Sequence, residues 1–123
     1  MRIKALAASL AIALLATPAL AHEPRKGPNG GELVDAGAYH IEVVGRGTAV
    51  EVLVSDAADK PVSAVGFKGT AIMVIDGRTQ RIALEPTADG KKLVGTAPAP
   101  VTSVKGAVQL TDRDGKTATG RIN

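Results

Sequence analysis

Turn-forming residues recur at short intervals after residue 30, and this spacing constrains the fold more than any other feature of the chain. The runs between the turns are rich in Val, Ile, Thr and Ala and are too short for ordinary helices. The turn segments are residues 45–47, 56–61, 76–77, 89–90, 98–100 and 112–115. This pattern predicts an all-β protein, and seven or eight short antiparallel strands favour an immunoglobulin-like β-sandwich.

The strands themselves follow from the runs between the turns. We expect them at residues 39–44, 49–55, 70–75, 79–84, 92–96, 107–111 and 117–122, with a weaker one at 31–35. Residues 22–31 are rich in proline and glycine and are expected to form an extended, irregular arm without a strand. The β-sandwich domain is therefore expected to occupy residues 32–123.

The first 21 residues have the pattern of a secretion signal. Arg2 and Lys4 precede an uncharged apolar run at residues 5–16, which is shorter than the roughly 20 residues needed to span a bilayer. Ala19-Leu20-Ala21 then provides a small-x-small cleavage site. We expect a cleaved helical signal peptide over residues 1–21, a periplasmic mature chain that begins at His22, and no membrane segment after cleavage.

Composition excludes several classes of protein. The 123-residue chain has no cysteine, which rules out disulfides and attachment of a lipid to a cysteine. Removing Arg2 and Lys4 with the signal leaves 13 basic and 12 acidic residues, a formal charge of 13 − 12 = +1 on the mature chain. With Tyr39 and Phe67 as its aromatic residues, this chain lacks the basic stripe and the stacking surface that nucleic-acid binding needs.

The hairpin around residues 45–47 suggests a site. A two-residue turn at residues 46–47 pairs Val43 with Val50 and thereby places Glu42 directly opposite Glu51. Like charges opposed across a ladder are destabilising, and a bound cation would offset the repulsion.

Two interpretations of this face stay open. In the first, Glu42 and Glu51 hold a metal ion together with the imidazole of His40, which lies on the same face. In the second, the face is simply solvated, with Arg46 or a lysine near the two glutamates.

His22 favours the metal interpretation. A mature chain that begins with histidine offers its α-amino nitrogen and its imidazole to one ion, and Cu(II) prefers nitrogen ligands in a tetragonal arrangement. His40 would supply a third nitrogen if the arm folded back onto the sheet, which would complete a histidine brace. The alternative is that the signal peptide ends before a histidine by chance.

A family resemblance is carried by His22, Gly30-Gly31, Asp35-Ala36-Gly37, Tyr39-His40-x-Glu42 and the segment VEVLVSDAADKPV. This pattern resembles small secreted proteobacterial proteins and the N-terminal domains of periplasmic heavy-metal efflux adaptors.

The resemblance implies metal-facing roles for His22, His40 and Glu42, and a turn role for Gly30 and Gly31. The mature chain departs from the richer members in having no histidine cluster, no cysteine and one methionine, Met73. A Cu(I) site is disfavoured because thiolate and thioether ligands are missing.

A hard-cation site is the alternative metal prediction. A site made of Glu42 and Glu51, with Asp35 or Glu32, would prefer Ca(II) or a lanthanide. Residues 112–115, DRDG, resemble the start of a calcium loop, but the sequence favours a hairpin turn there.

The last alternatives need no resident metal. No nucleophile motif accompanies the serines, so we do not expect an enzyme. A pure interaction module that binds a partner through an edge strand is the non-metal alternative. The sequence prediction is thus a periplasmic metal carrier, chaperone or buffer with His22, His40, Glu42 and Glu51 as site residues. Its expected partners are a transporter or acceptor protein, or a second copy bridged by the metal.

Overall fold

The computed structural model describes residues 25–123, which form nine antiparallel strands and no helix. The strands are β1 (Arg25–Lys26), β2 (Glu32–Ala36), β3 (Tyr39–Arg46), β4 (Ala49–Ser55), β5 (Lys68–Ile75), β6 (Arg78–Pro86), β7 (Leu93–Thr96), β8 (Gly106–Thr111) and β9 (Thr117–Ile122). The all-β prediction is confirmed, and each predicted strand overlaps an observed one. The predicted signal peptide and His22 lie outside the described residues.

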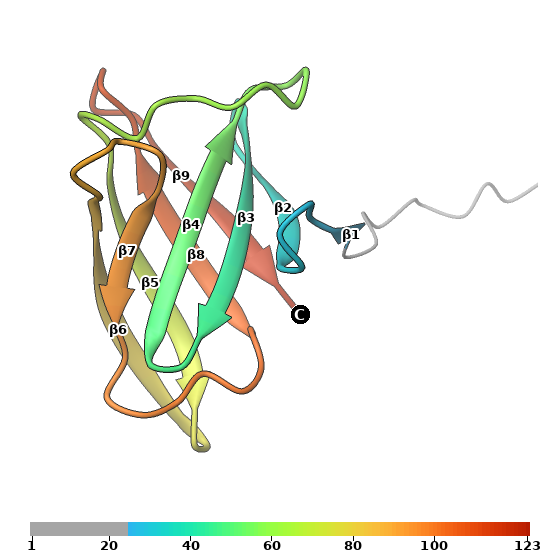
Figure 1. Cartoon of the computed structure of the whole chain (residues 1–123), viewed down its shortest axis with the longest axis vertical. Helices are drawn as coiled ribbons and strands as arrows, with labels where there is room; N and C mark the ends of the chain where they lie inside the picture. The colour runs from blue at the N-terminus through green and yellow to red at the C-terminus, as the bar shows by residue number, and fades with distance from the viewer. Residues whose placement is uncertain (1–24) are drawn as a thin grey trace, which may run out of the picture.

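The strands form one sheet in the order β1-β2-β3-β4-β7-β6-β5-β8-β9. Strand β6 makes the corner, because it pairs with β5 along most of its length and with β7 only through Glu85 and Pro86. The sheet therefore curls into a half-barrel in which β3 and β4 lie in front of β5 and β8 (Figure 1). Strands β2 and β9, far apart in the order, approach so closely that a Cβ on Gly120 would lie 3.0 Å from Val34 Cγ2.

The core fills the inside of this curl. Alternate residues of β3 to β9 point inward, and the buried ones are at most 4% exposed, among them Ile41 and Val43 on β3 and Met73 on β5. The rings of Tyr39 and Phe67 add an edge-to-face contact, with centroids 5.3 Å apart. Each fully buried aliphatic side chain contributes about 1.5–3 kcal/mol to the stability of the fold. Burial of these side chains therefore determines which residues of a strand point inward and which point outward. The outward residues of β2, β3 and β4 are left to form a site.

The turn between β3 and β4 differs from the prediction. Arg46 pairs with Ala49, so the two-residue turn is Gly47-Thr48 rather than residues 46–47. Gly47 has φ 57°, and a glycine with positive φ at the first central position is what a type II′ hairpin turn requires. The predicted register is therefore wrong by two residues, although every side chain keeps its predicted face.

This register separates the two glutamates. Glu42 lies opposite Leu53, and Glu51 lies opposite Val44. The predicted direct opposition of Glu42 and Glu51 is wrong, and so is the repulsion that suggested a shared cation.

The N-terminal arm is more ordered than its composition suggested. Arg25 and Lys26 form the short strand β1, which pairs with Leu33 and Glu32 of β2, so the prediction of an arm without a strand is wrong here. Residues 27–31 reverse the chain, with Gly27 N donating to Gly31 O at 2.9 Å. No helix among residues 25–123 is long and apolar enough to span a membrane.

Candidate functional site

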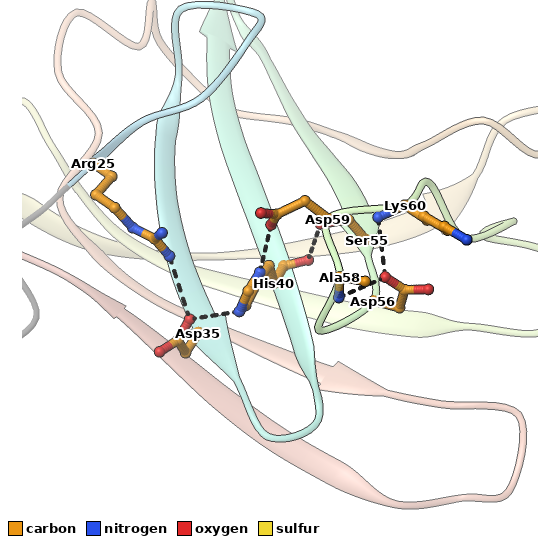
Figure 2. A network of polar contacts seen from close by, with 8 residues as sticks. All are labelled: Arg25, Asp35, His40, Ser55, Asp56, Ala58, Asp59 and Lys60. Carbon is orange, nitrogen blue, oxygen red and sulfur yellow. Dashed lines mark hydrogen bonds and ion pairs between the residues drawn. The ribbon is translucent and has the colours of Figure 1, made fainter.

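His40 lies near the start of β3 on the outer face of the sheet, between Asp35 of β2 and Ser55 of β4 in the strand register. Its side chain is only 21% exposed. Nδ1 of the ring lies 2.7 Å from Asp59 Oδ1, and Nε2 lies 3.3 Å from Asp35 Oδ1. Figure 2 shows the ring held between these two carboxylates. His40 is therefore oriented at both nitrogens.

The start of the described chain meets this cluster. The guanidinium of Arg25 lies 3.9 Å from Asp35 Oδ1, the same oxygen that contacts His40 Nε2 (Figure 2). Strand β1 is thus linked to the imidazole through the Asp35 carboxylate.

Asp59 comes from the loop between β4 and the isolated bridge at Pro61. Asp56 organises this loop, because its Oδ1 accepts hydrogen bonds from Ala58 N at 2.8 Å and Lys60 N at 3.0 Å. Asp59 has φ 61°, in the left-handed region that residues other than glycine rarely adopt. A tight turn and an uncommon backbone conformation together bring the Asp59 carboxylate to His40.

Glu42 is buried, and its carboxylate is bonded to groups of the protein itself. It is 3% exposed, and its carboxylate accepts hydrogen bonds from Asn29 N at 2.9 Å, Asn29 Nδ2 at 2.8 Å and Gly31 N at 2.9 Å. Gly27 packs so closely against it that a Cβ there would lie 2.2 Å from Glu42 Cδ. Glu42 thus fastens the 27–31 turn onto β3.

Glu51 has cationic partners instead. Its carboxylate lies 2.8 Å from Lys92 Nζ and 3.3 Å from Arg46 Nε, and the residue is 8% exposed. Arg46 and a lysine do lie beside Glu51, as the second interpretation of this face expected, although Glu51 itself is buried. The structure brings neither glutamate to His40.

The described residues do not complete a metal site by themselves. Within residues 25–123, no group of three or more His, Cys, Asp and Glu side chains is arranged to hold a metal ion. The geometry around His40 gives the reason. Asp35 and Asp59 contact different ring nitrogens, so a metal ion bound to one ring nitrogen could be bound by only one of the two carboxylates. His22, which was predicted to add ligands, lies outside the described residues.

The residues of the hard-cation alternative are also accounted for. Glu32 forms an ion pair with Lys26, and Asp35 belongs to the His40 cluster. Residues 112–115 form a hairpin turn between β8 and β9, in which Asp112 Oδ1 accepts Asp114 N and Lys116 N, both at 2.9 Å.

Sequence reasoning missed Asp59 altogether. A signal was available, because residues 56–60, DAADK, have nearly the pattern of residues 112–116, DRDGK, with aspartate in place of glycine at the fourth position. Aspartate tolerates the left-handed conformation better than most residues do, so this difference between the two turns points to Asp59 without assigning it a role.

An apolar pocket of about 310 Å³ adjoins the cluster. Leu33, Leu53, Pro28 and Pro61 line it, and Asp59 also contributes. A ligand or partner side chain in this pocket would therefore touch the residue that orients His40.

Comparisons with protein-family models, with curated proteins and with solved structures found no match to this chain.

Proposed function

We propose that the protein is a secreted, periplasmic metal-binding protein that carries or buffers Cu(II) and catalyses no reaction. The observation that supports this most strongly is the imidazole of His40, which is partly shielded and oriented by two carboxylates, one of which also pairs with Arg25 of β1. Imidazole held by carboxylates is a common metal ligand arrangement.

The length of the chain allows His22 to join this site. His22 precedes Arg25 by three residues, which span at most about 10–11 Å when fully extended. In the strand register Arg25 lies opposite Leu33, which is two residues, or about 7 Å, along β2 from Asp35, whose carboxylate is 3.3 Å from His40 Nε2. A mature N-terminus at His22 would offer its amino nitrogen and imidazole beside His40 and Asp35, a donor set that suits Cu(II).

The two glutamates act as supports in this proposal. Glu42 fixes the 27–31 turn and so determines where the arm leaves the sheet, while Glu51 forms ion pairs with Lys92 and Arg46. The immunoglobulin-like sandwich and the signal peptide over residues 1–21 belong to the same proposal. Coordination positions left open by the protein ligands would be filled by water, an acceptor or transporter protein, or a second copy of the chain.

The test is a competitive titration of the chain that begins at His22 with Cu(II), Zn(II), Ca(II) and La(III). We expect Cu(II) to bind tightest, because nitrogen donors favour it in the divalent series. One extra residue ahead of His22 should weaken Cu(II) binding by at least about tenfold, which corresponds to about 1.4 kcal/mol.

Two other results would contradict the copper proposal. Preferential binding of Ca(II) or La(III), unaffected by the extra residue, would establish the carboxylate alternative. The absence of any metal binding below millimolar concentration would leave the interaction module as the explanation.

A further inference from the structure

Two loops of this protein have the same hydrogen-bond pattern. In the loop after β4, Asp56 N donates to Lys60 O at 2.9 Å and Asp59 N donates to Asp56 O at 3.0 Å. In the β8–β9 hairpin, Asp112 N donates to Lys116 O at 2.9 Å, and the amide at the fourth position donates to Asp112 O at 3.1 Å. In both loops the first aspartate accepts the amides of the third and fifth residues.

The loops differ at their fourth position. The backbone of both loops is in the left-handed region at this position, with φ 61° at Asp59 and φ 82° at Gly115. Glycine adopts this conformation without steric cost, whereas a residue with a Cβ is strained. The Asp59 side chain takes no part in the hydrogen bonds that the two loops share. The loop therefore does not need an aspartate at this position.

The Asp59 carboxylate has a different partner, His40 Nδ1 at 2.7 Å. We infer that Asp59 is a positioning residue, placed at a left-handed position where its carboxylate holds the proton of His40 on Nδ1 and leaves Nε2 as the metal-binding nitrogen. A carboxylate on the second ring nitrogen fixes the tautomer and the ring orientation of a ligating histidine. This inference rests on the proposed copper function.

The same geometry assigns Asp35 its part. Its Oδ1 lies 3.3 Å from Nε2, the nitrogen that Asp59 leaves available, so Asp35 is the carboxylate placed to share a metal ion with the ring. Arg25 lies on the same carboxylate at 3.9 Å, so its positive charge would compete with a bound cation for Asp35.

The test compares Asp59→Gly with Asp76→Gly in the chain that begins at His22. Asp76 is a matched control, because it also has a positive φ, 52°, and lies in the exposed turn between β5 and β6. Both substitutions relieve backbone strain, but only the first removes a carboxylate from His40. We expect Asp59→Gly to weaken Cu(II) binding about 10–100-fold and Asp76→Gly to leave it unchanged. Asp59→Asn, which keeps a carbonyl oxygen for the Nδ1 proton, should recover part of the loss.

A readout without metal separates this inference from the proposed function. In the metal-free protein at alkaline pH, the ring ¹⁵N signals of His40 should show the Nδ1-protonated tautomer. They should shift toward a mixture in Asp59→Gly but not in Asp76→Gly. The role of Asp59 would be overturned if the ring signals of Asp59→Gly matched those of the wild type. It would also be overturned if the wild type bound Cu(II) and Asp59→Gly bound it equally tightly. If the ring signals change but the wild type binds no metal, Asp59 still orients His40, but its role in metal binding is overturned together with the copper function.

Discussion

Replacing His40 by alanine is expected to weaken Cu(II) binding to the chain that begins at His22 by more than about 100-fold. Mutating a residue that only hydrogen-bonds to a metal ligand already lowers metal affinity about 10–100-fold. His40 is proposed to bind the ion directly, so its loss should cost more. The fold should tolerate the change, because Asp35 and Asp59 are 41% and 65% exposed and such ion pairs contribute about 0–1 kcal/mol. Calorimetric titration and thermal unfolding of the same samples measure both effects.

The control for this experiment is Thr119→Ala, an exposed substitution on β9. It should leave both copper affinity and unfolding unchanged. If His40→Ala binds Cu(II) as tightly as the wild type while an extra N-terminal residue still weakens binding, the terminal chelate acts alone. The site on β3 would then be refuted.

Replacing Glu42 by alanine is expected to cost about 3 kcal/mol or more of unfolding free energy. Hydrogen bonds to a charged group contribute about 1.5–3 kcal/mol each, and Glu42 accepts three of them. The largest part of this cost comes from the Gly31 amide. Gly31 is buried, so its amide would lose its hydrogen-bond acceptor and could not bond to water instead. At about 4–8 °C per kcal/mol for a domain of this size, the melting temperature should fall markedly.

Glu51→Ala is the matched comparison, since both residues are buried glutamates on neighbouring strands. Its partners Lys92 and Arg46 have side chains that are 34% and 59% exposed, so water can replace the carboxylate. We expect a loss of about 1 kcal/mol or less. Equal losses in the two variants would contradict the role of Glu42 as the fastening of the N-terminal turn.

The strand positions could be predicted from the sequence because local patterns determine them. The register of β3 on β4 could not be predicted in this way, although the faces could. Pairing Val43 with Val50 or with Val52 buries the same side chains, so the hydrophobic pattern does not distinguish a slip of two residues. The turn decides, and the positive φ of Gly47 places it one residue later than predicted.

The candidate site could be predicted only in part, because Asp59 and the partners of Glu42 come from irregular segments. His40 was identified from its place beside the glutamates, yet its partners at the ring are Asp35 and Asp59. The sequence predicts that Glu42 needs a cation, whereas backbone amides of the N-terminal arm donate hydrogen bonds to its carboxylate. Amide donors of an irregular segment leave no pattern in the sequence, and for that reason this interaction was missed.

The pairing of β4 with β7 rather than with β5 also affects how the chain folds. Glu51 and Lys92, which this pairing brings together, are 41 residues apart in the sequence. The entropy of closing so long a loop is lost before the new contacts stabilise it, and sheets built from such pairings fold in about milliseconds to seconds. The local β2–β3–β4 meander can form early, but Glu51 can pair with Lys92 only when β7 joins β4. The ion pair of Glu51 with Arg46 can form within this meander, whereas its ion pair with Lys92 is a late folding event.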